Sequence, residues 1–191
     1  MKRISTTAVC SVLLALMLAL MPAAVLAETT VPAASASEYF SRRDLAGSWD
    51  EDEAIRIQLN GDSAACETGA AEINGSTVTI TREGVYVLTG TLEQGNVIID
   101  ADDSAKVQLV LDQASVHAVG TAAITVENAD KVFITLADDS DNALSASGSF
   151  SEDSNVDAAV FARDDLVFNG TGRLTVTCEN GNGIVGKDDL K

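Results

Sequence analysis

Two Asp-Asp pairs are the residues whose type and spacing most clearly offer chemistry. Asp164-Asp165 and Asp188-Asp189 each follow a basic residue and precede a leucine, and they stand 24 positions apart. If that interval is one structural repeat, the four carboxylates lie on adjacent layers about 4.8 Å apart and repel one another. A calcium ion, which accepts about six to eight oxygen ligands, would turn this repulsion into coordination. The spacing therefore predicts a calcium site at Asp164, Asp165, Asp188 and Asp189, with a solvated turn as the alternative.

The other ionisable residues offer less. Arg163 and Lys187 are candidates for the base of a lyase reaction, but the carboxylates beside them favour the protonated form, the wrong state for a base. The single histidine, His117, has no recognisable partner in the sequence. No serine nucleophile motif occurs after residue 27. The acidic stretch Asp138–Asn142 lacks the spacing of a calcium-binding loop and is interpreted as a solvated turn. These features favour a non-catalytic protein over a lyase.

Repeated strand patterns position these residues. Lys106–Leu111 is echoed 25 positions later by Lys131–Leu136, and Val160–Leu166 is echoed 24 positions later by Ile184–Leu190. Short alternating apolar and polar runs separated by Asn-Gly turns indicate β-strands. Repeats of this length indicate a solenoid, in which each coil buries its apolar face against its neighbours. The longer interval between the two pairs of echoes predicts one coil enlarged by an insertion over Asp138–Asp157.

The alternation also assigns the faces of the strands. Val107, Leu109 and Leu111 are predicted to face the core, whereas Gln108 and Val110 face outward. Equivalent residues should stack in columns formed by Val107, Val132, Leu166 and Leu190, and by Ile124, Val160 and Ile184. The fold class that fits is all-β, a right-handed parallel β-helix. A β-sandwich explains the strands but not the repeats.

The chain divides into three expected parts. Residues 1–27 have the charged start, apolar stretch and small-residue cleavage site of a signal peptide. Residues 28–50 are expected to be a linker and an N-terminal capping segment, in which Trp49 and Tyr39 cover the first coil. Residues 51–191 are expected to form the β-helix domain. The sequence stops one residue after the start of another predicted strand, so we expect a C-terminally truncated solenoid whose last coil is uncovered.

Composition limits the partners. The formal net charge is −17, and cleavage after residue 27 would remove Lys2 and Arg3 and leave the mature chain more acidic. Such a chain repels nucleic acid and anionic lipid headgroups. We therefore expect a secreted or cell-surface protein that binds no nucleic acid and does not insert its mature chain into a membrane. The remaining cysteines, Cys66 and Cys178, are interpreted as separate thiols.

Several segments together resemble a bacterial family usually described as carbohydrate-binding domain-containing proteins, which are exported right-handed parallel β-helices. The segments that carry the resemblance are Gly84–Leu92, Lys131–Leu136, Ala159–Leu166 and Gly183–Leu190. The resemblance implies non-catalytic binding of plant cell-wall polysaccharide, with cellulose and polygalacturonate as ligand types, and bound calcium. A structural or adhesive surface repeat is the alternative from a different class, and a pectate-lyase-like enzyme is the catalytic one.

Overall fold

A computed structural model describes residues 36–151 and 153–191. The predicted signal peptide, residues 1–27, lies outside this part of the chain. Within it, the only helix is the four-residue α2 (Ala36–Tyr39), and all other regular elements are β-strands. No helix in the described ranges has the length and apolar character needed to span a bilayer.

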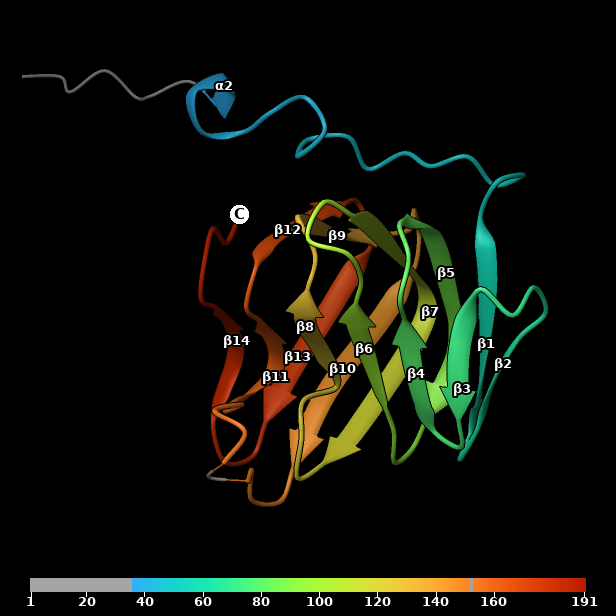
Figure 1. Ribbon diagram of the computed structural model, residues 1–191, viewed down its shortest axis with the longest axis vertical. Coiled ribbons are helices and arrows are strands. Elements are labelled where there is room, and N and C mark those ends of the chain that lie inside the picture. The colour runs from blue at the N-terminus through green and yellow to red at the C-terminus, as the bar shows by residue number, and fades with distance from the viewer. Residues whose placement is uncertain (1–35, 152) are drawn as a thin grey trace, which may run out of the picture. The chain divides into compact units, whose positions relative to one another are not determined.

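Strands recur in the same order along the chain, and each recurrence forms one coil (Figure 1). A coil consists of a long strand, or two shorter ones in its place, followed by a strand of about five residues. The strands before the regular coils are β1 (Ile55–Gly61), β2 (Ala64–Cys66), β3 (Ala71–Asn74) and β4 (Thr77–Ile80). The coils are β5 (Gly84–Leu92) with β6 (Asn96–Asp100); β7 (Lys106–Val119) with β8 (Ile124–Asn128); β9 (Lys131–Leu136), β10 (Asp141–Ser147) and β11 (Ala158–Ala162); and β12 (Asp165–Gly170), β13 (Arg173–Cys178) and β14 (Asn182–Gly186).

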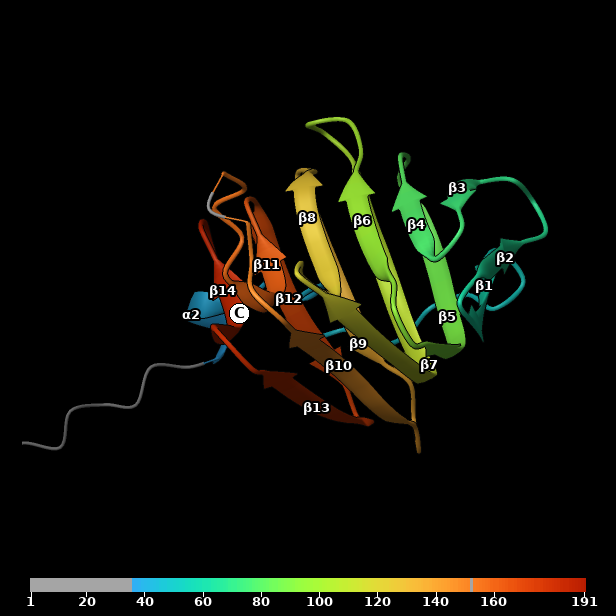
Figure 2. The same ribbon diagram turned by 90° about the horizontal axis from the view of Figure 1, so that it is seen from below.

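The strands of successive coils pair into two sheets that face each other across the core (Figure 2). The first sheet has the order β12-β9-β7-β5-β1-β2, with β10 joined to β7 and β13 joined to β10, and the second has the order β14-β11-β8-β6-β4-β3. Pairing between coils is parallel throughout, and only β1 with β2 and β3 with β4 pair antiparallel. These two antiparallel pairs form the edge of each sheet at the end where the chain enters. The β-sandwich alternative is wrong, because its strands would pair antiparallel.

The strand register confirms the predicted repeat lengths. Val132 pairs with Val107 on one side and with Leu166 on the other, and a parallel bridge joins Leu166 to Leu190. The second column is formed as predicted by Ile124, Val160 and Ile184. Because equivalent apolar side chains stack in every coil, the core is a continuous ladder of Val, Ile and Leu.

The predicted insertion has a different extent. Residues 141–147 form β10, a regular strand of the solenoid that pairs with β7 and β13. The extra residues follow it, because Val160 lies 36 positions after its partner Ile124 but only 24 before its partner Ile184. The loop 148–157 therefore accounts for most of the additional length. The polar composition of residues 138–157 concealed the strand β10, whose buried positions are filled by Asn142, Leu144 and Ala146.

The loop 148–157 packs on the outer face of the second sheet. Phe150 and Val156 from the loop contact Phe161 of β11, whose side chain is fully buried. Arg163 and Lys187 lie over the Phe161 ring, 5.5 and 5.3 Å from its centroid. An outward-facing phenylalanine of the second sheet is thus covered by the loop and by two cationic side chains.

The segment before β1, residues 41–50, runs along the outer face of the first sheet, and we call it the strap. The Asn169 side-chain amide donates to the carbonyls of Asp44 and Ala46, both at 3.2 Å, in the last coil. Further along, the Gln108 amide donates to the Ser48 carbonyl at 3.3 Å. The strap thus crosses several coils and ties the last of them to the first, which is more than the terminal cap that was expected.

Trp49 belongs to this strap and covers more than the first coil. It packs against Val87, Val110 and Ala137 on the outer face of three successive coils. Tyr39, by contrast, is 64% exposed. The predicted alternation of Gln108 and Val110 away from the core is confirmed, but the strap buries both of them. The outer face of the sheet is therefore a second, smaller apolar layer.

Candidate functional site

Two turns that lie side by side form an open hollow at one edge of the first sheet. One turn joins β9 to β10 and the other joins β12 to β13, and each follows a strand that pairs with its neighbour in register. The backbone nitrogens of Thr171 and Gly172 donate to the Leu136 carbonyl, and the nitrogen of Arg173 donates to the Ser140 carbonyl at 2.8 Å. These bonds hold the second turn directly against the first.

Buried polar side chains fix the floor of the hollow. The Asn142 amide donates to the Ser140 hydroxyl at 2.7 Å and to the Arg173 carbonyl at 3.2 Å, while its oxygen accepts from the Ala114 nitrogen at 2.9 Å. Asn142 therefore joins three coils, and both Asn142 and Ser140 are nearly inaccessible to solvent. A satisfied polar network of this kind holds the turns in one arrangement.

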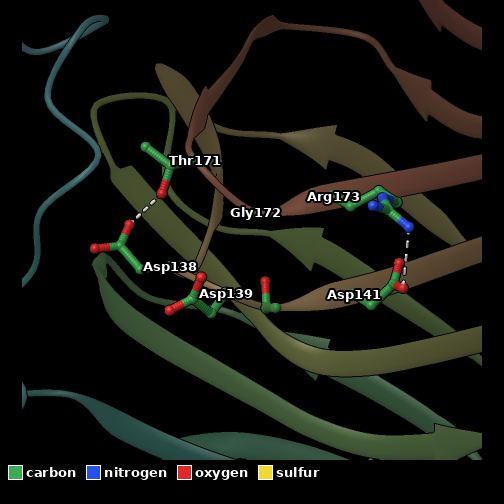
Figure 3. A pocket seen from close by; sticks show the side chains of 7 residues that line it. Asp138, Asp139, Asp141, Thr171, Gly172 and Arg173 are labelled. Atoms are coloured by element: carbon green, nitrogen blue, oxygen red, sulfur yellow. Dashed lines mark hydrogen bonds and ion pairs between the residues drawn. The ribbon is translucent and has the colours of Figure 1, made fainter.

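The hollow encloses about 770 Å³ and is lined by side chains from both turns (Figure 3). An adjoining hollow of about 420 Å³ shares Asp138 and Thr171 and is completed by strap residues, including Trp49, and by Glu51, which directly follows the strap. The two hollows together form one groove, which we call the Trp49 groove. It extends from Arg173 at one end to the indole at the other.

Carboxylates and hydroxyls dominate the chemistry of the groove. The Thr171 hydroxyl donates to the Asp138 carboxylate, and Arg173 lies 3.6 Å from the Asp141 carboxylate (Figure 3). Between them, the Asp139 carboxylate has no hydrogen-bond or ion-pair partner among the described residues. Carboxylates, a guanidinium and a half-exposed indole ring are the groups that bind sugar hydroxyls and stack on sugar faces. The prediction of a merely solvated turn over Asp138–Asn142 missed this arrangement, because the strap that completes it is about 90 positions away in sequence.

The four aspartates predicted to bind calcium lie on adjacent coils, as the 24-residue interval required. However, three of them already have partners within the protein. Asp164 accepts a hydrogen bond from the Ala129 nitrogen at 3.0 Å, Asp165 lies 3.0 Å from the Lys131 ammonium, and Asp189 lies 3.3 Å from the Lys191 ammonium. Only the exposed Asp188 carboxylate has no partner among the described residues.

The strap adds a fifth carboxylate to this region. The Asp44 side chain is 1% exposed and lies between the two lysines, 3.8 Å from Lys131 and 3.8 Å from Lys191. Burial raises the pKa of Asp44, but hydrogen bonds with Ser41 and the charges of both lysines outweigh it, so the pKa lies below the ordinary value of 3.8. The pKa of Lys131 is raised by its hydrogen bond to Asp165, against the effect of burial. Both partners are therefore charged at neutral pH.

As arranged, these aspartates do not fit a shared calcium site. The lysines already offset the repulsion that motivated the prediction, and no group of three acidic, histidine or cysteine side chains in the described residues is close enough to hold a metal ion. Calcium at Asp164, Asp165, Asp188 and Asp189 stays a prediction. Melting temperatures measured with calcium and with a chelator check it, because an ion bound by the folded state alone raises the melting temperature.

The two lyase-base candidates are also engaged. Arg163 lies 2.6 Å from the Glu127 carboxylate, and Lys187 lies over the Phe161 ring. Neither residue lines the Trp49 groove. Cys66 and Cys178 are free, as interpreted from the sequence.

His117 does have partners, which the sequence did not reveal. Its Nδ1 lies 2.9 Å from the Ser145 hydroxyl and its Nε2 lies 3.1 Å from the Ser147 hydroxyl. The partners stand 28 and 30 positions away on the neighbouring coil. Only the register between β7 and β10 brings them together.

Comparison with solved structures identifies the class of protein. The polysaccharide lyase-like protein from C. thermocellum, in its gadolinium derivative, is similar with a TM-score of 0.69 and 30% identity, over 72% of this chain and 57% of that one. The parallel sheets described above place this protein in the all-β class, and the likeness shows that its fold is similar to that of the polysaccharide lyase-like protein.

Sequence comparison identifies the family. The family model described as "Carbohydrate-binding domain-containing protein" matches residues 74–191, so this chain belongs to that family. A curated relative with the same description, from Acetivibrio thermocellus, is 35% identical over 118 residues. The match covers 60% of this chain and 41% of the relative, so the chain spans less than half the length of that protein.

Proposed function

We propose that the protein is a secreted right-handed parallel β-helix that binds plant cell-wall polysaccharide in the Trp49 groove without cleaving it. The observation that carries this proposal is the groove itself, in which an indole ring, an unpaired carboxylate and a guanidinium line one continuous hollow. Aromatic rings stack on the apolar faces of sugars, and carboxylates accept hydrogen bonds from sugar hydroxyls. Membership in the carbohydrate-binding family supports the same ligand class.

The charge of the groove favours a neutral polysaccharide of the cellulose type. Asp138, Asp139, Asp141 and Glu51 line it, and Arg173 is its only basic lining residue. A polygalacturonate chain carries a carboxylate on each sugar, so it would be repelled at close range. Binding of an acidic chain would need a divalent cation, such as calcium, to bridge the two sets of carboxylates.

A non-catalytic role is supported by the state of the ionisable side chains. A general base must be close to the proton that it removes and must be free to accept it. Arg163 and Lys187 are paired or packed outside the groove, and both ring nitrogens of His117 are hydrogen-bonded to the Ser145 and Ser147 hydroxyls. Among the carboxylates of the groove, Asp141 pairs with Arg173 and Asp138 accepts from Thr171, whereas Asp139 is unpaired, so an assay for unsaturated product is the decisive test for catalysis.

Binding of cellohexaose, measured by calorimetry, tests the proposal. We expect Trp49→Ala to weaken binding about tenfold, because it removes the apolar area that the ring buries against the sugar together with about 0.5–1.5 kcal/mol from stacking. Tyr39→Ala is the matched aromatic control, since Tyr39 is exposed outside the groove. Asp139→Ala should also weaken binding, and because residue 139 has a φ of +58°, which alanine tolerates less well than aspartate, the melting temperature of the variant is measured with its affinity to separate lost contact from strain in the turn. Wild-type affinity in both groove variants would place the ligand elsewhere.

Catalysis is checked in the same samples. Incubation with cellulose and polygalacturonate, with and without calcium, should give retention on the polysaccharide and no rise in absorbance from unsaturated product. Appearance of that product would show a lyase. Absence of both retention and product would favour the structural or adhesive alternative.

A further inference from the structure

A hollow separate from the Trp49 groove, which we call the His117 hollow, has the chemistry of a sugar subsite. It lies at the ends of β7, β10 and β13, encloses about 450 Å³, and is lined by His117, Ser145, Ser147, Thr177, Cys178 and Glu179, with Ala146 at its floor. The strap covers the first half of the same sheet and the loop 148–157 covers the second sheet. Here Thr175 and Thr177 remain exposed, and Ser145 and Ser147 are half-exposed.

The register between coils arranges these side chains in a flat layer. Ser145 pairs with His117 on one side and with Thr177 on the other, so all three project outward at the same level. The imidazole ring lies along β10, because Nδ1 is bound to Ser145 and Nε2 to Ser147 at 2.9 and 3.1 Å. Both ends of the ring are held, so its plane is fixed on the surface.

The hydroxyls of Ser145 and Ser147 are left with complementary hydrogen-bonding capacity. A neutral imidazole has one N–H and one bare nitrogen, so one serine accepts from the ring and the other donates to it. The accepting serine keeps its own O–H free to donate, whereas the donating serine keeps lone pairs free to accept. Each hydroxyl of a sugar can donate one hydrogen bond and accept up to two. A donor and an acceptor held side by side are therefore suited to a pair of sugar hydroxyls.

The His117 hollow is connected to the Trp49 groove along β10 and β13. Asp141 and Arg173 begin these strands and line the groove. Ser147 and Thr177 lie near the other end of the strands and line the His117 hollow. Between them, the outward positions are Ala143 and Thr175, which pair with each other and have small side chains. A seven-residue strand such as β10 spans about 20 Å. A single extended chain of sugars can thus lie along this passage.

We propose that the His117 hollow is a second subsite for the polysaccharide, and that one extended neutral glycan occupies it and the Trp49 groove together. This inference rests on the proposed function, because it extends the ligand already placed in the groove. It adds residues on β7, β10 and β13 to the site and predicts that affinity depends on chain length. A short glycan reaches only one subsite, whereas a long one binds both and gains from the linkage.

The test compares cellohexaose with cellobiose by calorimetry on the full chain. For wild type, cellohexaose should bind much more tightly than cellobiose. We expect His117→Ala and the double variant Ser145→Ala/Ser147→Ala to weaken cellohexaose binding about five- to tenfold, as loss of one or two hydrogen bonds does. Cellobiose binding should change less, because the groove remains. Thr91→Ala is the matched control: it removes an exposed hydroxyl from the same sheet, outside both hollows.

The outcomes separate this inference from the proposed function. If Trp49→Ala weakens binding but the His117 and serine variants bind cellohexaose like wild type, the groove stands and the second subsite is overturned. If the serine variant binds weakly but melts at the wild-type temperature, the loss is one of contact and supports the subsite. If wild type binds neither oligosaccharide, the proposed function and this extension both fail.

Discussion

Asp44 shows how one side chain can bind the strap to the solenoid. Its carboxylate is buried, accepts from the Ser41 nitrogen at 2.9 Å and lies between Lys131 and Lys191. One carboxylate oxygen, Oδ1, has no hydrogen-bond partner, so its stabilisation comes from the charge of Lys131. A buried charge is stable only when such partners remain in place.

We expect Asp44→Asn to lower the free energy of unfolding by about 1–3 kcal/mol at neutral pH, because it leaves two lysine charges without their shared partner. Denaturant titration measures the change. Asp188→Asn is the matched control, since that exposed carboxylate has no partner in the described residues and its loss should shift stability by less than about 0.5 kcal/mol. Equal effects from the two substitutions would show that Asp44 contributes no more than a surface charge.

The same side chain predicts a pH dependence. The folded-state pKa of Asp44 lies below its ordinary value of 3.8, so its contribution is fully present above that value and is lost as the pH falls through the lowered pKa. The stability difference between wild type and Asp44→Asn should therefore be constant near neutral pH and shrink in acid below pH 3.8. Denaturant titrations of both proteins from neutral to acid pH measure it. A difference that stays constant into strong acid would contradict the assignment.

At the scale of the elements, close contact of backbones decides where the strap and the turns lie. Gly170 ends β12 with a φ of +93°, and a Cβ there would lie 2.2 Å from the Leu136 carbonyl oxygen. A Cβ on Gly47 of the strap would in turn lie 2.8 Å from the Gly170 Cα. Three segments from different parts of the sequence therefore meet at a point that admits no side chain.

Gly170→Ala should consequently be far more damaging than a glycine substitution in an open turn. We expect a loss of about 3 kcal/mol or more, from the backbone conformation together with the clash against Leu136. Gly61→Ala is the control, because its φ of +77° is similarly unfavourable but no atom lies within 4 Å of the added Cβ. That variant should lose only about 1–2 kcal/mol in denaturant titration. Similar losses would mean that conformation alone, and not contact, matters at residue 170.

The elements also show what the sequence could predict. The 24- and 25-residue intervals predicted the parallel register because each coil repeats the same buried residues, so the information is local and periodic. The strap carries no such repeat. Its position depends on contacts between Asp44 and Lys191, or Ser48 and Gln108, which no sequence spacing encodes. The Trp49 groove and the His117 partners escaped prediction for the same reason, since each joins residues of different coils or of the strap.

At the scale of the whole molecule, the net charge of −17 acts on every charged ligand before any contact forms. The Trp49 groove has the same sign as the rest of the protein, because its lining contains four carboxylates and one guanidinium. Fields from exposed charges extend about 8 Å at physiological ionic strength, so salt weakens the long-range part of the repulsion. Affinity for an acidic glycan should thus depend on salt, and affinity for a neutral one should not.

We therefore expect hexagalacturonate to bind more weakly than cellohexaose in the absence of calcium, and its affinity to rise with added salt while that of cellohexaose stays constant.

Asp139→Asn should shift the ratio of the two affinities toward hexagalacturonate, because it removes the unpaired charge from the centre of the groove yet keeps one acceptor oxygen. Asp62→Asn changes the net charge equally on the exposed turn after β1 and controls for the long-range field. If both substitutions shift the ratio equally, the repulsion belongs to the whole molecule. Tighter binding of hexagalacturonate by calcium-free wild type would contradict the neutral-ligand assignment, since the groove offers only Arg173 to hold a chain of carboxylates.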